Sequence, residues 1–487
     1  MPARTPDDDA APAPGAAHRT GVARADASAA SSITSGTTPR AGDASDDAAH
    51  PATVARRGAQ RRRPPAWLNR PAAVWVGFAV VHVYFLCWMA TFFLHGWAFS
   101  DTEQYREWAM AGYNAPDRGS VSPWVYPVLA QVPIMFPRIA GHDLYLLAWT
   151  LMITALNAVA MWFLLHRAPR SGVLAGWWWV VFTVFLGYLS FARVEGVAAP
   201  IVFIGLLYAV GHPVVGSALL SIATWIKVWP AAVLLAMVIA LKQRVRIIAA
   251  GVVVTLCVVL GVLILGGIER IADFLLNQGS RGMQLEATFS TPWVWAAVLG
   301  LADSRIADNT AINSTEVYGP GVEVMASLMQ PLLLMAVLIA AVLLIRALRR
   351  GADRARLVHA GSLLLTIVLI VFNKVGSPQF MIWLAPVVMV GLLHDHVRWR
   401  IPALLTLGIA ATTFVIYPLF YTPLIHANPV MAGVLTLRNV LLVILLGWTV
   451  RRIWQLGAPA AAGARPGATV LNAEEPSAKD KKSSPRR

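Results

Sequence analysis

Two carboxylates, Asp101 and Glu103, stand just beyond the first long apolar segment of the chain. A carboxylate held near a membrane surface can act as a general base on a hydroxyl group, or it can hold a metal ion bound to phosphate. A structural role is the alternative, because Ser100 or Asp101 also suits the N-terminal cap of a short interfacial helix. The pattern therefore has two interpretations, a reacting carboxylate or a helix cap.

Two cations, Lys227 and Arg438, lie in apolar surroundings, where a charge is costly and usually functional. Lys227 interrupts an apolar segment just before Pro230. It either binds an anionic ligand such as a lipid phosphate, or its side chain extends to the membrane surface. Arg438 lies about five residues, roughly 7 Å, inside the last long apolar run. It needs a carboxylate, a phosphate or the membrane surface as its partner.

Two further polar groups lie in the segments 281–286 and 373–380. Arg281, Gln284 and Glu286 are residue types that suit a phosphate and sugar hydroxyls, although a solvated loop has the same pattern. Lys374 and Gln379 flank a Gly-Ser-Pro sequence that indicates a turn between two apolar segments. If all four groups converge on one face of the molecule, their cations and carboxylates suit an anionic lipid substrate.

The elements that must position these residues are membrane helices. Of the 487 residues 57% are apolar and 13% are charged, whereas soluble proteins have about 45–50% and about 25%. We therefore predict an all-α polytopic membrane protein with a bundle of about twelve membrane segments and interfacial helices in its outer loops. The predicted segments are 72–93, 144–166, 173–190, 197–210, 213–226, 229–241, 247–266, 324–345, 357–372, 380–394, 401–420 and 433–450.

The orientation follows from residues 213–241 and from the loop charges. As one helix this stretch would be roughly 43 Å long, against a hydrocarbon core of ~30 Å, so we predict two short helices. With this break, Lys and Arg gather in the loops of one side, while acids outnumber them in residues 94–143 and 267–323. Both termini are then cytoplasmic and the candidate site faces the outer side of the membrane. The net charge of +15 is thereby explained without nucleic acid.

The domain prediction is a disordered cytoplasmic tail over residues 1–65, a membrane domain over 66–455 and a second disordered cytoplasmic tail over 456–487. The sequence has no Walker loop, no dinucleotide-binding glycine pattern, no HExxH helix and no nucleophile elbow. An energy-rich donor would therefore have to arrive in the membrane, carried by a lipid. The two cysteines indicate neither a disulfide framework nor a metal site.

Four motifs, in this order along the chain, carry a resemblance to a known family. They are Asp101-x-Glu103 after the first segment, Lys227-x-x-Pro230, Arg281-Gly-Met-Gln-Leu-Glu286, and Ser377-Pro-Gln-Phe-x-x-Trp-Leu-x-Pro386. Over residues 72–450 the chain resembles the GT-C membrane glycosyltransferases, and among them the actinobacterial α-1,2-mannosyltransferases that use polyprenyl-phosphate-mannose. It departs from the family pattern at Ala287, where Ser is usual, and at Phe380, where Tyr is usual.

The resemblance implies a role for each candidate residue. Asp101 would be the general base that deprotonates the acceptor hydroxyl as the hydroxyl attacks the anomeric carbon, with inversion. The cations that would hold the phosphate are Lys227, Arg281, Lys374 and Arg438. The groups that would bind sugar hydroxyls are Glu103, Gln284, Glu286 and Gln379. Tyr105 and Tyr126 would form part of the acceptor groove. Arg193 and Glu195 are either a structural ion pair or part of the site.

The expected partners are a polyprenyl-phosphate sugar donor, a glycolipid acceptor and membrane lipids. No cofactor is indicated, and a divalent metal is left open. Two other functions compete with a mannosyltransferase: a pentosyl (arabinosyl) transferase with a related lipid donor, and a transporter or flippase of polyprenyl-linked glycans. Transporters often show inverted repeats, and we find no convincing repeat between the two halves of this chain. The charged groups also gather on one side only, which favours the transferase.

Overall fold

The computed structural model describes residues 65–112, 124–265, 271, 282–301, 303–310 and 314–458. The chain divides into two units, residues 1–62 and 63–487, and the described residues belong to the second. They are mostly helical, and eight of the helices described are long and apolar enough to cross a membrane. The protein is therefore a polytopic, essentially all-α membrane protein, as predicted. The predicted tails fall almost entirely outside the described residues.

The helices follow the predicted apolar segments closely. The long ones are α1 (Pro71–Trp88), α5 (Tyr145–Arg167), α6 (Gly172–Leu186), α10 (Arg244–Ile264), α13 (Val322–Arg349), α14 (Arg354–Val371), α15 (Leu384–Phe414) and α17 (Pro429–Leu456). The shorter ones are α2 (Ala90–Leu94), α3 (Asp101–Ala111), α4 (Gln131–Met135), α7 (Glu195–Tyr208), α8 (Pro213–Ile226), α9 (Pro230–Ala240), α12 (Thr291–Val298) and α16 (Tyr421–Ile425).

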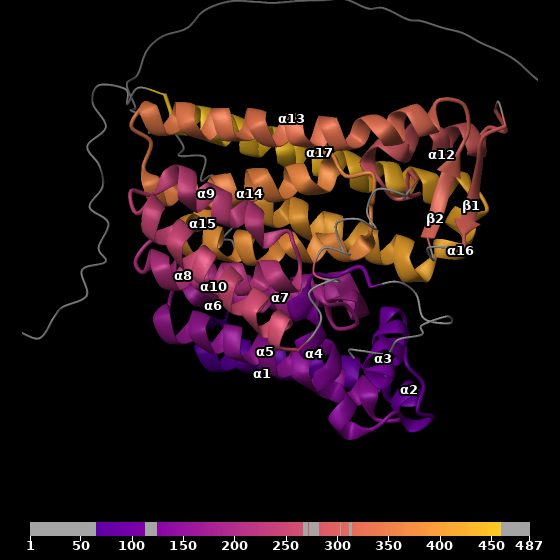
Figure 1. The fold of residues 1–487 in the computed structure, drawn as a ribbon, viewed down its shortest axis with the longest axis horizontal. Helices are drawn as coiled ribbons and strands as arrows, with labels where there is room; N and C mark the ends of the chain where they lie inside the picture. The colour runs from indigo at the N-terminus through magenta and orange to yellow at the C-terminus, as the bar shows by residue number, and fades with distance from the viewer. Residues whose placement is uncertain are drawn as a thin grey trace, which may run out of the picture. The chain divides into compact units, whose positions relative to one another are not determined.

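Short 3₁₀-helical segments and one π-helical segment, η8, connect several of these elements. They are η1 (Ala66–Asn69), η2 (Val128–Ala130), η3 (Phe136–Ala140), η4 (Gly187–Ser190), η6 (Thr288–Ser290), η7 (Pro378–Trp383) and η8 (Val415–Leu419). The long helices run side by side, and the short elements α2, α3, α12 and α16 gather beyond one end of them (Figure 1). We call the end that carries Asp101, Lys227 and Glu286 the Asp101 end. The opposite end, which carries Arg354, Arg398 and Arg452, is the arginine end.

The break predicted near Lys227 is confirmed. Helix α8 ends at Ile226 and α9 begins at Pro230, and between them Lys227 has an extended backbone (φ −150°, ψ 135°). Proline has no N–H and a fixed φ, so it interrupts one helix and suits the first turn of the next. The break lies at the Asp101 end, because Lys227 contacts Glu195 at the start of α7.

The break predicted between the segments 380–394 and 401–420 is confirmed, but the connection is shorter than predicted. Helix α15 continues through this region with a kink at Asp395, whose backbone is not helical (φ −154°, ψ 72°). The Asp395 carboxylate accepts hydrogen bonds from the Arg398 backbone N–H at 3.2 Å and from Arg398 Nη1 at 2.8 Å. These bonds cap the second half of the helix directly, so no separate loop is needed.

The region 267–323 contains a β-hairpin that the sequence analysis did not expect. Strand β1 (Arg305–Asn309) pairs antiparallel with β2 (Ser314–Tyr318). The segment 283–285 follows the other side of β2, with Val317 N–H donating to Met283 O and Leu285 N–H to Thr315 O, each at 3.0 Å. Thr315, Val317 and Tyr318 are residue types that favour strands. The prediction of interfacial helices alone is therefore corrected, and the hairpin fixes the segment that leads to Glu286.

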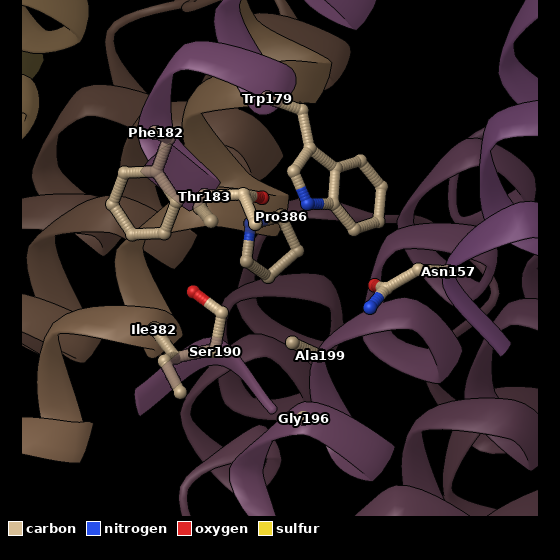
Figure 2. Close-up of a pocket in the computed structure, with 10 residues that line it drawn as sticks. Asn157, Trp179, Phe182, Thr183, Ser190, Gly196, Ala199, Ile382 and Pro386 are labelled. Atoms are coloured by element: carbon tan, nitrogen blue, oxygen red, sulfur yellow. The ribbon is translucent and has the colours of Figure 1, made fainter. Parts of the chain in front are cut away.

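The centre of the bundle is closely packed. Between α5, α6, α7 and α15 the structure encloses a cavity of only about 20 Å³, which Figure 2 shows with Asn157, Thr183 and Ser190 among its lining residues. That is room for about one water molecule. This cavity is therefore too small for a sugar or a lipid headgroup.

Candidate functional site

Asp101 is the first residue of α3, and the residue before it has an unusual backbone. Ser100 has φ 59° and ψ −140°, a combination that residues other than glycine rarely adopt. Its side chain makes no cap bond with the helix, and its Oγ lies 3.4 Å from Tyr417 Oη instead. A capping role for Ser100 is therefore wrong. Strained backbone of this kind is concentrated at functional sites.

A buried arginine holds the Asp101 carboxylate. Arg193, in the turn before α7, forms an ion pair with Asp101 through Nη1, and its Nη2 donates to Tyr417 Oη at 3.4 Å. The Arg193 side chain is 6% exposed, whereas that of Asp101 is 31% exposed. The buried guanidinium of Arg193 thus orients the Asp101 carboxylate. The exposed part of that carboxylate remains open to an approaching hydroxyl group.

Lys227 is the centre of a second group. Its Nζ lies 3.0 Å from Glu195 Oε1 and 4.2 Å from the centre of the Tyr126 ring. The hydroxyls of Tyr126 and Tyr105 are 3.0 Å apart, and the Val194 N–H donates to Tyr105 Oη at 3.4 Å. Both rings are buried, and burial raises the pKa of Tyr105. We expected the two tyrosines to form part of an open acceptor groove. They belong instead to an internal hydrogen-bonded network.

Arg438 pairs with Glu286, the carboxylate of the third sequence motif. Arg438 Nη1 lies 2.9 Å from Glu286 Oε2, and Nη2 donates to the Glu286 carbonyl and, at 2.9 Å, to Asn439 Oδ1. Both side chains are almost completely buried. Burial raises the pKa of Glu286 to about 7, although the guanidinium of Arg438 opposes this shift. The charged form of Glu286 at neutral pH therefore depends on Arg438.

The third and fourth motifs contact each other directly. Gln284 N–H donates to Lys374 O at 3.0 Å, and Gln284 Oε1 accepts from Gly376 N–H at 3.0 Å. Gln284 Nε2 donates to Ser314 Oγ of β2 at 2.8 Å. Lys374 is buried in this contact region. Gln284 therefore joins the loop after α14 to the hairpin, a structural task that differs from the expected binding of sugar hydroxyls.

The fourth motif also packs against the break between α8 and α9. The Trp383 ring stacks on Trp229, with centroids 5.7 Å apart, and on Phe380 at 4.2 Å. Gln379 is buried in the same turn, η7. Two motifs that are far apart in the sequence thus meet near Lys227.

The three ion pairs form one cluster. Besides its bond to Asp101, Arg193 interacts electrostatically with both Glu195 and Glu286. We call the residues Asp101, Arg193, Glu195, Lys227, Glu286 and Arg438 the ion-pair cluster. Buried charges are stable only when they are paired and hydrogen-bonded, which explains why cations and carboxylates alternate. Such a cluster can orient a base and can offer cations to a phosphate.

Two expectations about individual charges need correction, and one lies outside the described residues. Lys227 was expected to bind an anionic ligand or to extend to the membrane surface, but it contacts a carboxylate; Arg438 has the carboxylate partner that was one of its three alternatives. Glu103 is half exposed and pairs with Arg106 on the same helix at 2.7 Å, a geometry that i,i+3 helix partners commonly have. Arg281 belongs to the residues that the structure does not describe.

Sequence reasoning named Arg193 and Glu195 but not their partners. They were weighed as a pair with each other, yet each forms its ion pair with a residue from another element. Their position two residues apart was the only signal. Tyr417 was missed, because a tyrosine in a long apolar run has no feature that distinguishes it from a packing residue.

Comparisons with known proteins give no relative for this chain. It matches no family model, no curated protein and no solved structure. Across the described part of the chain, no group of three or more His, Cys, Asp or Glu side chains is placed to hold a metal ion. Function has therefore to be argued from the cluster itself.

Proposed function

We propose that this protein is an inverting glycosyltransferase of the GT-C type. It would transfer a mannosyl residue from a polyprenyl-phosphate donor to a glycolipid or lipoglycan acceptor at the outer face of the plasma membrane. The proposal includes about twelve membrane segments, with α7, α8, α9 and the two halves of α15 among them, and both termini in the cytoplasm. The motifs quoted from the sequence support it, and no nucleotide motif competes with it.

The observation that carries the proposal is the partly exposed Asp101 carboxylate on a buried cluster of ion pairs. In the reaction, an acceptor hydroxyl oxygen forms a bond to the anomeric carbon of the donor sugar. The bond from that carbon to the phosphate oxygen breaks, and polyprenyl phosphate leaves with the electron pair. Asp101 takes the hydroxyl proton as general base.

The cations of the cluster have a second role in this mechanism. The leaving phosphate gains negative charge as the bond breaks, and preorganised cations stabilise charge that develops in a transition state. Arg193 adjoins Asp101 and is therefore the cation nearest to the proposed base. Lys227, which lies over the Tyr126 ring, would be a second cation that stabilises the negative charge of the phosphate. Because each cation already has a carboxylate partner, it is fixed in place before the donor arrives.

The test is a transfer assay with the purified full-length chain in lipid nanodiscs. Radiolabelled polyprenyl-phosphate-mannose serves as donor and phosphatidylinositol mannoside as acceptor. We expect Asp101→Asn to lower the rate about 10²- to 10⁴-fold, the usual effect of removing a general base. Glu107→Gln is the matched control, since Glu107 is an exposed carboxylate on the same helix, and it should leave the rate unchanged.

Two results would refute the proposal. One is full transfer by a correctly folded Asp101→Asn variant, with folding checked by the thermal unfolding midpoint. The other is movement of lipid-linked sugar across liposomes by the wild-type protein without any transfer, which would favour a transporter.

A further inference from the structure

A pocket much larger than the central cavity lies between the hairpin and the start of α13. Its volume is about 450 Å³, within the range of ~300–1,000 Å³ that is usual for small-molecule sites. Strand β2 and the adjoining Gly282 form one side, and the first turns of α13 form the other. No role has been given to this pocket by the mechanism above.

The hairpin side of the pocket presents a fixed carboxylate. Glu316 is 3% exposed, and its oxygens accept from Gly282 N–H at 3.0 Å, Asn309 Nδ2 at 3.1 Å and Tyr318 Oη at 3.3 Å. A Cβ atom at Gly282 would lie 2.7 Å from Glu316 Oε2, so a side chain at this position would displace the carboxylate. A carboxylate has about four acceptor positions, and Glu316 can therefore accept a further bond from a ligand.

The α13 side combines one charge with an apolar surface. Glu323 lies exposed in the first turn of the helix, and Val322, Val324 and Ala326 line the same wall. Val324 is 64% exposed. Helix α13 is long and apolar enough to cross a membrane, so its first turn should lie at the membrane surface. A ligand there can have a polar part in the pocket and an apolar part along α13.

The lining chemistry selects the class of ligand. Among the described lining residues the charged side chains are carboxylates, and the guanidinium of Arg305 lies behind them, 5.0 Å from the centre of the Tyr318 ring. The carboxylates, the amide and the phenol that line the pocket suit a neutral ligand with many hydroxyl groups. We infer that this pocket binds the neutral sugar headgroup of a glycolipid. This inference rests on the proposed function, in which that glycolipid is the acceptor.

The pocket is connected to the ion-pair cluster by one short segment. Gly282 N–H bonds to Glu316 in the pocket, and Glu286, four residues later, bonds to Arg438 in the cluster. Between them, Gln284 bridges to the loop that carries Lys374. A headgroup in the pocket would therefore lie beside the segment that supports the proposed reaction centre.

The experiment measures binding directly, without any transfer. The full-length protein in nanodiscs is titrated calorimetrically with octyl α-D-mannopyranoside, and separately with methyl α-D-mannopyranoside and with calcium. The variants are Glu323→Gln and Tyr318→Phe. The control is Asp308→Asn, which changes an exposed carboxylate of the same hairpin that does not line the pocket.

We expect the octyl glycoside to bind the wild-type protein and the control with equal affinity. It should bind each pocket variant about tenfold more weakly, because each variant loses one hydrogen bond to a charged or polar partner. The methyl glycoside should bind more weakly than the octyl glycoside. Equal binding of the two glycosides would point to a free glycan and refute the glycolipid. Unchanged glycoside binding in both variants, or calcium binding that depends on Glu323 in place of glycoside binding, would refute the sugar site.

The two proposals can fail separately. If wild type transfers mannose and Glu323→Gln leaves the acceptor KM unchanged, the pocket inference is wrong and the transferase stands. If the glycoside binds through Glu323 but wild type transfers nothing, the transferase is wrong and a sugar-binding pocket remains.

Discussion

The Asp101 end and the arginine end of the helices both carry arginines, but these side chains are buried at the Asp101 end and more exposed at the arginine end. At the Asp101 end, Arg193 and Arg438 are buried, and each bonds to a carboxylate. At the arginine end, the Arg398 side chain is 53% exposed, and Arg452 has Arg356 and Arg398 as close electrostatic neighbours. Cations that remain hydrated tolerate like charges nearby, but cations removed from water require a counter-charge. Burial, and not the number of charges, therefore separates a candidate site from a surface that only sets orientation.

The largest effect should come from removing Glu286. Glu286→Gln leaves Arg438 buried without a counter-charge, and a guanidinium does not lose its proton. We expect a loss of about 3–5 kcal/mol in the free energy of unfolding, measured by SDS titration of the purified protein in bicelles. Unchanged stability would mean that the pair is not buried from water, and the contrast between the two ends would fail.

Removing Arg438, the partner of Glu286, should lower the free energy of unfolding by less, and the loss should depend on pH. In Arg438→Gln the remaining Glu286 can take up a proton, because burial already raises its pKa to about 7 in the presence of Arg438. The folded variant then binds more protons than the unfolded chain, so its stability should rise as the pH falls from 8 to 6. Wild type should show a smaller change over this range. A variant that loses stability as the pH falls would contradict the assignment.

A smaller loss of stability is expected at Gly376, where the segment 373–380 approaches the backbone of Glu286 and Ala287. A Cβ atom added at Gly376 would overlap Ala287 N and the Glu286 carbonyl group. Gly376→Ala should therefore displace the segment that holds Glu286 and lower the free energy of unfolding by about 1–3 kcal/mol. Gly433→Ala is the matched control, since nothing lies within 4 Å of a Cβ there. Equal stability of the two variants would show that the motifs do not depend on this contact.

The sequence predicted the helices well and the partners of the charged residues poorly. Long apolar runs define membrane helices by themselves, and Pro230 marks its break locally. The hairpin was missed because short strands in a polar region have a weak pattern beside strong helical ones. Pairs such as Arg193 with Asp101 depend on how segments far apart in the sequence pack together, and an ion pair of that kind leaves no trace in local spacing. The break at Asp395 was predicted, but as a longer loop, because the charged residues 395–400 were interpreted as a solvated connection.

The smallest effect should be found at the arginine end. Arg398→Gln removes a cation that pairs with Asp395 at 2.8 Å but is half exposed, and exposed pairs contribute about 0–1 kcal/mol. The backbone N–H of Arg398 still bonds to Asp395, so the cap at the kink persists in the variant. SDS titration should therefore show a change of about 0.5 kcal/mol, and added salt should reduce it further. A loss as large as that of Glu286→Gln would mean that pairing stabilises both ends alike, and the distinction drawn from burial would have to be abandoned.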